Sequence, residues 1–155
     1  EELRAYAQAN CRGLHGIARA FDVFEHMDGR SDNGGESEAR AAMILAGVAA
    51  PELQVENTRP GNAGYYLADY GWQMPDGSWK LAELHGLGKF EDDAQNDPEH
   101  TAAKTYRAAL MRDANLRAMG HNVIHFKLSD TYDVKAFGSM MRGYGIPTTK
   151  PYADS

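Results

Sequence analysis

The chain has 155 residues, of which 43% are hydrophobic and 25% charged, and its formal net charge is −6. This fits one water-soluble domain of ordinary size, argues against a protein that coats nucleic acid without sequence preference, and offers no apolar run of the roughly 20 residues that a membrane span needs. A single cysteine, Cys11, excludes an internal disulfide and a multi-cysteine zinc site, and it suits a cytoplasmic location.

The N-terminal segment is polar and helix-forming, so no signal peptide is predicted. Apolar residues recur at spacings of three and four from residue 2 to 25, which predicts one helix that Gly13 and Gly16 weaken in its middle. Because the chain begins at Glu1 and not at Met, we expect a trimmed chain or the C-terminal part of a longer protein. We therefore assign residues 1–30 to an N-terminal helix that can link to an upstream domain and pair in a homodimer, and 31–155 to the main domain.

Turn-forming residues follow at 28–35, and a second helix is predicted over residues 36–46. The apolar period then changes from about 3.6 to about two, which predicts strands at 53–57, 65–72 and 80–86. The two links between them contain Pro-Gly and Pro-Asp-Gly, which are typical of hairpin turns. We expect an antiparallel three-stranded meander.

The second half of the chain adds a polar loop and two more helices around one strand. A helix is predicted from Pro98, with Asp97 as its N-cap, to residue 119. A short buried strand at 122–126 should return to the same sheet, and a last helix spans 132–142. The order α-α-β-β-β-α-β-α predicts an α/β fold with a mixed sheet and helices packed on it.

Several polar side chains lie where they can converge near strand ends. Asp69 lies in the second strand and Glu83 in the third, so the hairpin can bring both acids to one face. His85 follows Glu83 by two residues, on the same face of the strand. Lys89 lies beyond a glycine-rich turn, and Glu36 opens the second helix. Two or three acids beside a lysine can hold Mg²⁺, polarise a phosphodiester and activate a water.

These motifs resemble the PD-(D/E)XK nuclease superfamily, whose core is α-β-β-β-α-β. The segments that carry the likeness are GESEAR (35–40), PELQV (51–55), YLADYGW (66–72), AELHGLGKF (82–90) and MRDANLRAMGHNVIHF (111–126). They are most similar to the branch near very-short-patch repair endonucleases, and to the C-terminal domain of actinobacterial AbiEi-antitoxin-like proteins. The resemblance implies a restriction-endonuclease-like fold for residues 31–155.

The resemblance also implies roles for individual residues. Asp69 and Glu83 match the metal-binding acids of the second and third core strands, and Glu36 matches the acid of the first helix. Lys89 matches the lysine of the branch's E-x-D-G-x-x-K-Y-like pattern. The departure is His85, where this branch usually has Asp; the loss of a carboxylate favours Mn²⁺ over Mg²⁺.

Structural interpretations stand beside these catalytic ones. Asp69 can pair with an arginine, the third strand can expose Glu83 to water, and Glu36 can stabilise the first turn of its helix. His85 is equally a metal ligand, a base or a hydrogen-bonded strand residue. Three cations of the 98–119 helix can contact phosphate or belong to a solvated face: Lys104, Arg107 and Arg112.

Two functions follow as hypotheses. The first is a metal-dependent endonuclease that hydrolyses DNA phosphodiester bonds, with Asp69 and Glu83 on the metal and Glu36, His85 and Lys89 completing the site. The second is a nuclease-fold domain that no longer cleaves and serves as a DNA-binding or protein-interaction module of an antitoxin-like regulator. A purely structural dimerisation domain is a third alternative. An arginine salt bridge at the two acids would favour the inactive module.

Overall fold

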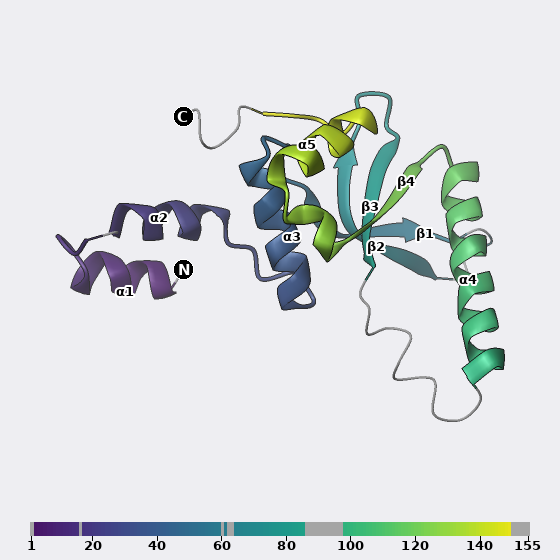
Figure 1. Ribbon diagram of the computed structural model, residues 1–155, viewed down its shortest axis with the longest axis horizontal. Coiled ribbons are helices and arrows are strands. Elements are labelled where there is room, and N and C mark those ends of the chain that lie inside the picture. The colour runs from purple at the N-terminus through teal and green to yellow at the C-terminus, as the bar shows by residue number, and fades with distance from the viewer. Residues whose placement is uncertain (1, 16, 60, 62–63, 86–97, 150–155) are drawn as a thin grey trace.

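The computed structural model describes residues 2–15, 17–59, 61, 64–85 and 98–149 (Figure 1). Its elements follow the order expected from the sequence, except that two helices replace the predicted N-terminal helix and a short 3-10 helix precedes the last α-helix. They are α1 (Glu2–Asn10), α2 (Ile17–His26), α3 (Gly34–Leu45), β1 (Glu52–Thr58), β2 (Tyr65–Gln73), β3 (Trp79–His85), α4 (Pro98–Ala118), β4 (Asn122–Lys127), η2 (Leu128–Thr131) and α5 (Val134–Gly143).

The four strands form one mixed sheet in the spatial order β1-β2-β3-β4. The pairs β1–β2 and β2–β3 are antiparallel, as the hairpin turns predict. The pair β3–β4 is parallel, with Glu83 opposite His125, so the segment that contains α4 crosses over between two neighbouring parallel strands. The predicted meander and the return of the fourth strand are confirmed.

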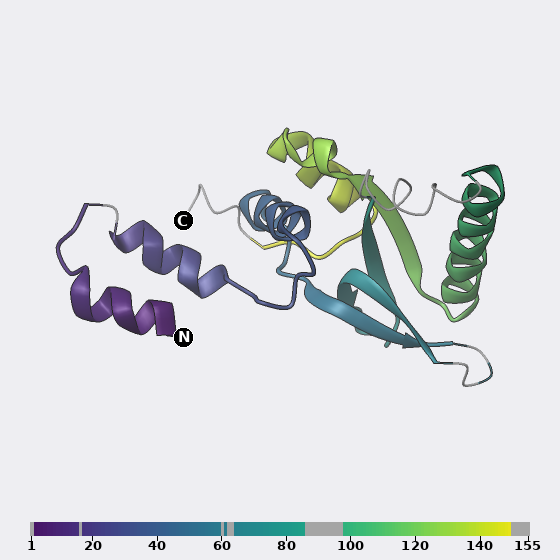
Figure 2. The same ribbon diagram turned by 90° about the horizontal axis from the view of Figure 1, so that it is seen from below.

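The helices cover the sheet on two sides (Figure 2). On one side α3 and α5 pack on a core whose largest fully buried side chains include Tyr70, Phe126 and Phe137. On the other side α4 contributes Leu116 to a smaller cluster with Val55, Ala68, Leu81 and Val123. This three-layer arrangement confirms the mixed α/β class.

Side-chain alternation along β1 and β2 breaks at one point. Leu53 and its partner Tyr70 belong to the core under α3 and α5, whereas Val55 and its partner Ala68, two residues away, belong to the cluster under α4. Between them lies Gln54, a non-glycine residue with a φ of 52°. In a regular strand, residues two apart lie on the same face of the sheet. Leu53 and Val55 lie on opposite faces, so the side chains of β1 change face at Gln54.

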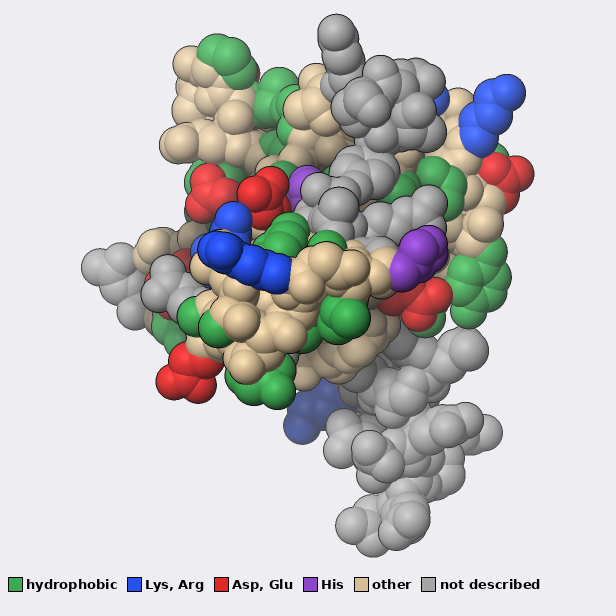
Figure 3. All heavy atoms as spheres, turned by 90° about the vertical axis from the view of Figure 1, so that its left-hand side faces the viewer, with side chains coloured by type: hydrophobic (Ala, Val, Ile, Leu, Met, Phe, Trp, Pro, Cys, Tyr) green, Lys and Arg blue, Asp and Glu red, His purple; other side chains and the backbone are tan. Residues whose placement is uncertain are grey.

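The N-terminal segment differs from the predicted single helix. Helix α1 ends at Asn10 and α2 begins at Ile17, and Gly13 lies in the turn between them with a φ of 82°. That conformation suits glycine, which explains why the apolar period does not continue as one helix. Helices α1 and α2 form a helical hairpin, which is closed by Arg4 and Glu25, whose Nη2 and Oε1 atoms are 3.3 Å apart. It projects from the body (Figure 1), and acidic, basic and hydrophobic side chains are interspersed over this side (Figure 3).

One smaller expectation is also corrected. The last helix begins at Val134, two residues later than predicted, because Leu128–Thr131 form a 3-10 turn and Asp133 accepts from the Ala136 amide as the cap. In the β2–β3 hairpin, Trp72 pairs with Lys80 and lies in the opposite cluster from Trp79, so the two tryptophans do not pack on each other. Within the described residues no helix has the length and apolar character to cross a membrane.

Candidate functional site

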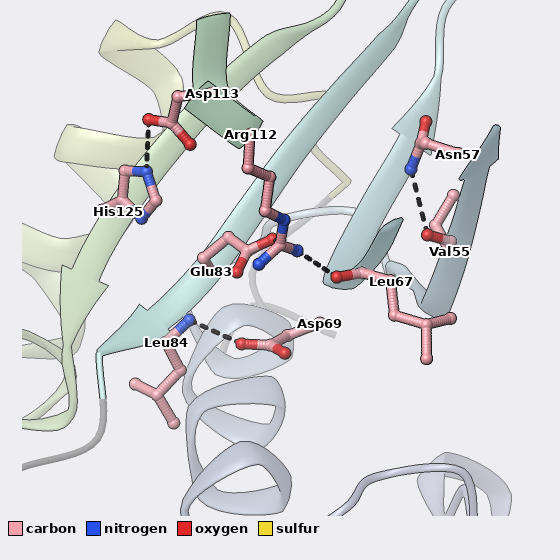
Figure 4. Close-up of polar contacts among 9 residues, drawn as sticks. All are labelled: Val55, Asn57, Leu67, Asp69, Glu83, Leu84, Arg112, Asp113 and His125. Atoms are coloured by element: carbon pink, nitrogen blue, oxygen red, sulfur yellow. Dashed lines mark hydrogen bonds and ion pairs between the residues drawn. The ribbon is translucent and has the colours of Figure 1, made fainter. Parts of the chain in front are cut away.

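The candidate site lies where β2 and β3 separate. Regular pairing between them reaches Tyr70 and Ala82 and goes no further toward the hairpin's open end. Beyond that pair, the backbone N–H of Leu84 donates to Oδ2 of Asp69 at 2.8 Å (Figure 4). A side-chain carboxylate therefore takes the place of a backbone carbonyl as acceptor. Asp69 thus completes the hydrogen bonding of β3 at the point where the ladder opens.

The second acid, Glu83, is bound to α4. Arg112 donates from Nη2 to Oε1 of Glu83 and to the carbonyl oxygen of Leu67, so one guanidinium joins α4 to β3 and β2 (Figure 4). The Glu83 side chain is only 13% exposed and that of Arg112 28%. Nε of Arg112 is buried, and no hydrogen-bond partner is found for it in the described part of the chain. Removing either partner of such a half-buried, charge-assisted pair would leave the other charge without its counter-ion, so the stability of the pair depends on both side chains.

Glu36 belongs to the beginning of α3. Its carboxylate accepts from the Asp32 amide at 2.8 Å and from Nδ2 of Asn33 at 2.9 Å, while Asn33 Oδ1 accepts from the Glu36 amide at 3.0 Å. Gln54 Nε2 donates to Glu36 Oε2 at 3.2 Å. Although the side chain is almost fully buried, these donors replace water around its charge. Glu36 therefore holds the entry to α3 and the unusual backbone of β1.

His85 lies on the α4 side of β3, the side predicted from its spacing to Glu83. Its ring stacks on His125, with 4.7 Å between centroids and 24° between planes. His125 Nε2 lies 2.8 Å from Oδ2 of Asp113 on α4 (Figure 4). Although His85 is exposed, partial desolvation of its ring, and then the neighbouring His125, lower its pKa below its ordinary value.

The predicted metal-binding residues have separate partners. Glu83 is bound by an arginine of α4, Asp69 by the backbone of β3, and Glu36 by groups around the start of α3. Lys89, the predicted transition-state cation, lies outside the described residues. Among the residues that are described, no group of three or more His, Cys, Asp or Glu side chains is arranged to hold a metal ion.

Two parts of the site were not predicted from the sequence. Gln54 contacts Glu36 from a left-handed backbone conformation, which no sequence signal indicates for glutamine. Tyr66 lies close to two cations: the Arg59 guanidinium carbon is 4.6 Å and that of Arg112 is 5.9 Å from its ring centroid. Asn115 Nδ2 donates to the Tyr66 hydroxyl at 2.8 Å. An arginine three residues before an asparagine on one helix is too common to reveal such a contact.

The three predicted phosphate-contacting residues divide into two groups. Lys104 and Arg107 are exposed on α4, consistent with an accessible cationic surface. Arg112 faces the sheet and is bound to Glu83. The whole of α4 carries four Lys/Arg and two Asp/Glu, 4 − 2 = +2, in a chain of net charge −6. It is therefore a locally cationic element of an acidic protein.

Comparisons with protein-family models, with curated proteins and with solved structures return no match for this chain. The resemblance to PD-(D/E)XK nucleases thus stays a prediction from sequence motifs.

Proposed function

We propose that this protein is a nuclease-like domain that binds nucleic acid through α4 and does not cleave it. This is the second of the two hypotheses from the sequence. The observation that carries it is the ion pair between Glu83 and Arg112, because the guanidinium occupies Oε1, one of the two oxygens with which that acid would bind a metal.

The other acids support the same proposal. Oδ2 of Asp69 accepts a backbone N–H of β3, and the Glu36 carboxylate accepts donors from Asp32, Asn33 and Gln54. Each carboxylate thus has a role in holding the fold. Metal-assisted hydrolysis needs oxygen ligands that converge on one ion and can polarise a phosphodiester. Dependence on Mg²⁺ or Mn²⁺ is a prediction of the endonuclease hypothesis.

Support for nucleic-acid binding comes from the charge of α4. The exposed Lys104 and Arg107 lie three residues apart, which places them on one side of the helix. Arg117 is also exposed, and its Nη2 atom lies 3.6 Å from Oδ2 of Asp113. Cations on a protein of net negative charge confine phosphate contact to one surface, whereas the repulsion elsewhere limits non-specific coating.

The binding experiment measures fluorescence anisotropy of labelled oligonucleotides at several salt concentrations. We expect K104Q and R107Q each to weaken binding several-fold and to lower the salt slope by about one, because each removes about one phosphate contact. K135Q on α5 is the matched control, since Lys135 is exposed but lies on the opposite layer. Equal effects of K104Q and K135Q would contradict a role for α4.

A cleavage assay distinguishes this proposal from the endonuclease hypothesis. Supercoiled and single-stranded DNA are incubated with the protein in Mg²⁺ and in Mn²⁺, beside the D69A and E83A variants. We expect no cutting above the buffer control. Metal-dependent cutting that both substitutions abolish would overturn the proposal and establish the metal-dependent nuclease.

A further inference from the structure

The outward side of α4 combines cations with large apolar side chains. Tyr106 is 63% exposed, Leu110 52% and Met111 60%. Tyr106 and Leu110 are one turn apart, and Arg107 and Met111 form the neighbouring row, so the two kinds of side chain interleave along the helix. The inward side is marked by Leu116, which is fully buried. Figures 1 and 2 both show α4 beside the sheet with its other side facing away from the body.

We infer that this surface binds unpaired nucleotides, with bases against Tyr106 and its apolar neighbours and phosphates at Lys104 and Arg107. The inference rests on the proposed function and adds the class of nucleic acid. Stacking of a base on an aromatic ring contributes about 1–3 kcal/mol and accepts any base. An exposed tyrosine on the same outward side of the helix as Arg107 provides this combination of contacts.

The apolar side chains are what favour single strands over a duplex. In a duplex the bases are paired and stacked, so a helix lying on the backbone meets phosphates and sugars and leaves Tyr106, Leu110 and Met111 without a partner. A helix that reads the major groove needs polar side chains toward base edges. Among the α4 side chains that the structure describes between Lys104 and Arg117, however, the exposed ones are apolar or cationic. Unpaired bases supply flat apolar faces of matching chemistry.

The charge of the surface favours a polyanion over a neutral apolar partner. From residue 104 to 118 the sequence has four cations and one acid, Asp113, which contacts His125 and Arg117. Because Arg112 faces the sheet and is bound to Glu83, the exposed cations are Lys104, Arg107 and Arg117. Along this stretch the helix rises about 1.5 Å per residue, so Lys104 and Arg117 are separated by about 20 Å along the axis. That length accommodates only a few nucleotides, which is at the small end of single-strand binding sites of about 4–16 nucleotides.

The test compares oligonucleotides of about 20 nucleotides, single-stranded and as the duplex, by anisotropy of the full chain. We expect the single strand to bind at least about tenfold more tightly. Y106A should weaken single-strand binding by about 5- to 100-fold, the effect of losing one stacked base, whereas Y106F should retain most of the affinity. Y132A is the matched control, because Tyr132 is 70% exposed but lies beside η2 on the other layer.

Heparin, a polyanion without bases, serves as the competitor. We expect it to displace oligonucleotide from wild type and Y106A alike at low salt, since it contacts only the cations. The inference is overturned if the duplex binds as tightly as the single strand, or if Y106A affects binding no more than Y132A. If neither oligonucleotide binds at all, the proposed function itself fails. The two failures are thereby distinguishable.

Discussion

Arg112 contacts both strands at the place where the β2–β3 pair opens. Its guanidinium reaches an acid of β3 and a carbonyl of β2, and its ring neighbour Tyr66 is held by Asn115 from the same helix. A single residue of α4 thus satisfies polar groups that the interrupted ladder leaves available. Burial of both side chains makes the loss of either partner costly, because the remaining charge keeps its desolvation cost without its counter-ion.

A double-mutant cycle of Arg112 and Glu83 tests this coupling. We expect R112M and E83Q each to lower the free energy of unfolding by about 1–3 kcal/mol, because each leaves a partly buried group without its partner. The double variant should lose less than the sum of the two, by about 1 kcal/mol or more. Urea denaturation followed by circular dichroism measures all four proteins. Strictly additive losses would show that the two side chains do not stabilise the fold together.

His85 makes the free energy of unfolding depend on pH. Its pKa is lowered by partial desolvation of the ring and by His125, with Lys127 acting in the same direction and Asp113 and Asp69 opposing it. The folded state therefore binds fewer protons at this residue than the unfolded state, for which the pKa is about 6.5. The resulting stability is present above pH 6.5 and is lost as the pH falls through the lowered pKa.

We expect H85N to flatten the decline in the free energy of unfolding between about pH 7 and pH 5. H15N is the control, since His15 is exposed in the turn after α1. Urea unfolding at a series of pH values measures both. If the H85N curve declines as steeply as that of H15N, His85 does not carry the effect.

At the scale of elements, much of the architecture can be predicted from local sequence patterns. The change of period near Leu53, the Pro-Gly turns and Pro98 at a helix start indicate the order of strands and helices without long-range information. Three features depend on contacts between distant residues and could not be predicted. They are the face change at Gln54, the opening of the ladder at Asp69, and the Arg112–Glu83 pair, whose partners are 29 residues apart.

The candidate site, too, could be predicted only in part, because some of its contacts join distant residues. Alternation along β3 places Glu83 and His85 on one side, and the structure agrees. Alternation says nothing about which helix supplies a counter-ion, so Arg112 was assigned to phosphate contact. The end of α1 at Asn10 is a different case. Gly13 and Gly16 are poor helix formers and indicate a break, but the regular spacing of the apolar residues favours one continuous helix.

The contact between α3 and α5 depends on a glycine. A Cβ atom added to Gly138 would lie 2.9 Å from Cβ of Ala46 and 3.2 Å from its carbonyl oxygen, so the two elements approach too closely for a larger residue. We expect G138A to lower the free energy of unfolding by about 1–3 kcal/mol through this overlap. G143A is the control on the same helix, because a Cβ there meets no atom within 4 Å.

The control should be neutral or slightly stabilising, since alanine restricts the unfolded chain more than glycine does. Thermal or urea unfolding measures the difference between the two variants. A G138A protein as stable as G143A would mean that α5 can move away from α3 at little cost.

At the scale of the whole molecule, the N-terminal hairpin is a separate feature. It extends away from the sheet in both ribbon views and is tied to α3 by the bond from Arg40 to the His26 carbonyl (Figures 1 and 2). The two cores lie entirely within α3 to α5 and the segments around them. The hairpin therefore contributes little to the burial that stabilises the sheet.

We expect a chain beginning at Asp28 to unfold cooperatively, with a thermal midpoint within about 5 °C of the full chain. Differential scanning calorimetry of the two proteins measures this. Loss of a cooperative transition would instead make α1 and α2 part of the folding unit, and it would contradict the division near residue 30.

The most direct measurement of the proposed function is an NMR titration of the full chain with a single-stranded oligonucleotide, following backbone amide resonances. We expect the largest shifts along α4, at Lys104, Tyr106, Arg107 and Leu110, with small ones at Asp69 and in α1 and α2. Addition of Mg²⁺ should leave the Asp69 and Glu83 resonances unchanged. Shifts centred on Asp69 and Glu83 that require Mg²⁺, with α4 unaffected, would contradict a non-cleaving binding domain and favour a metal-dependent nuclease.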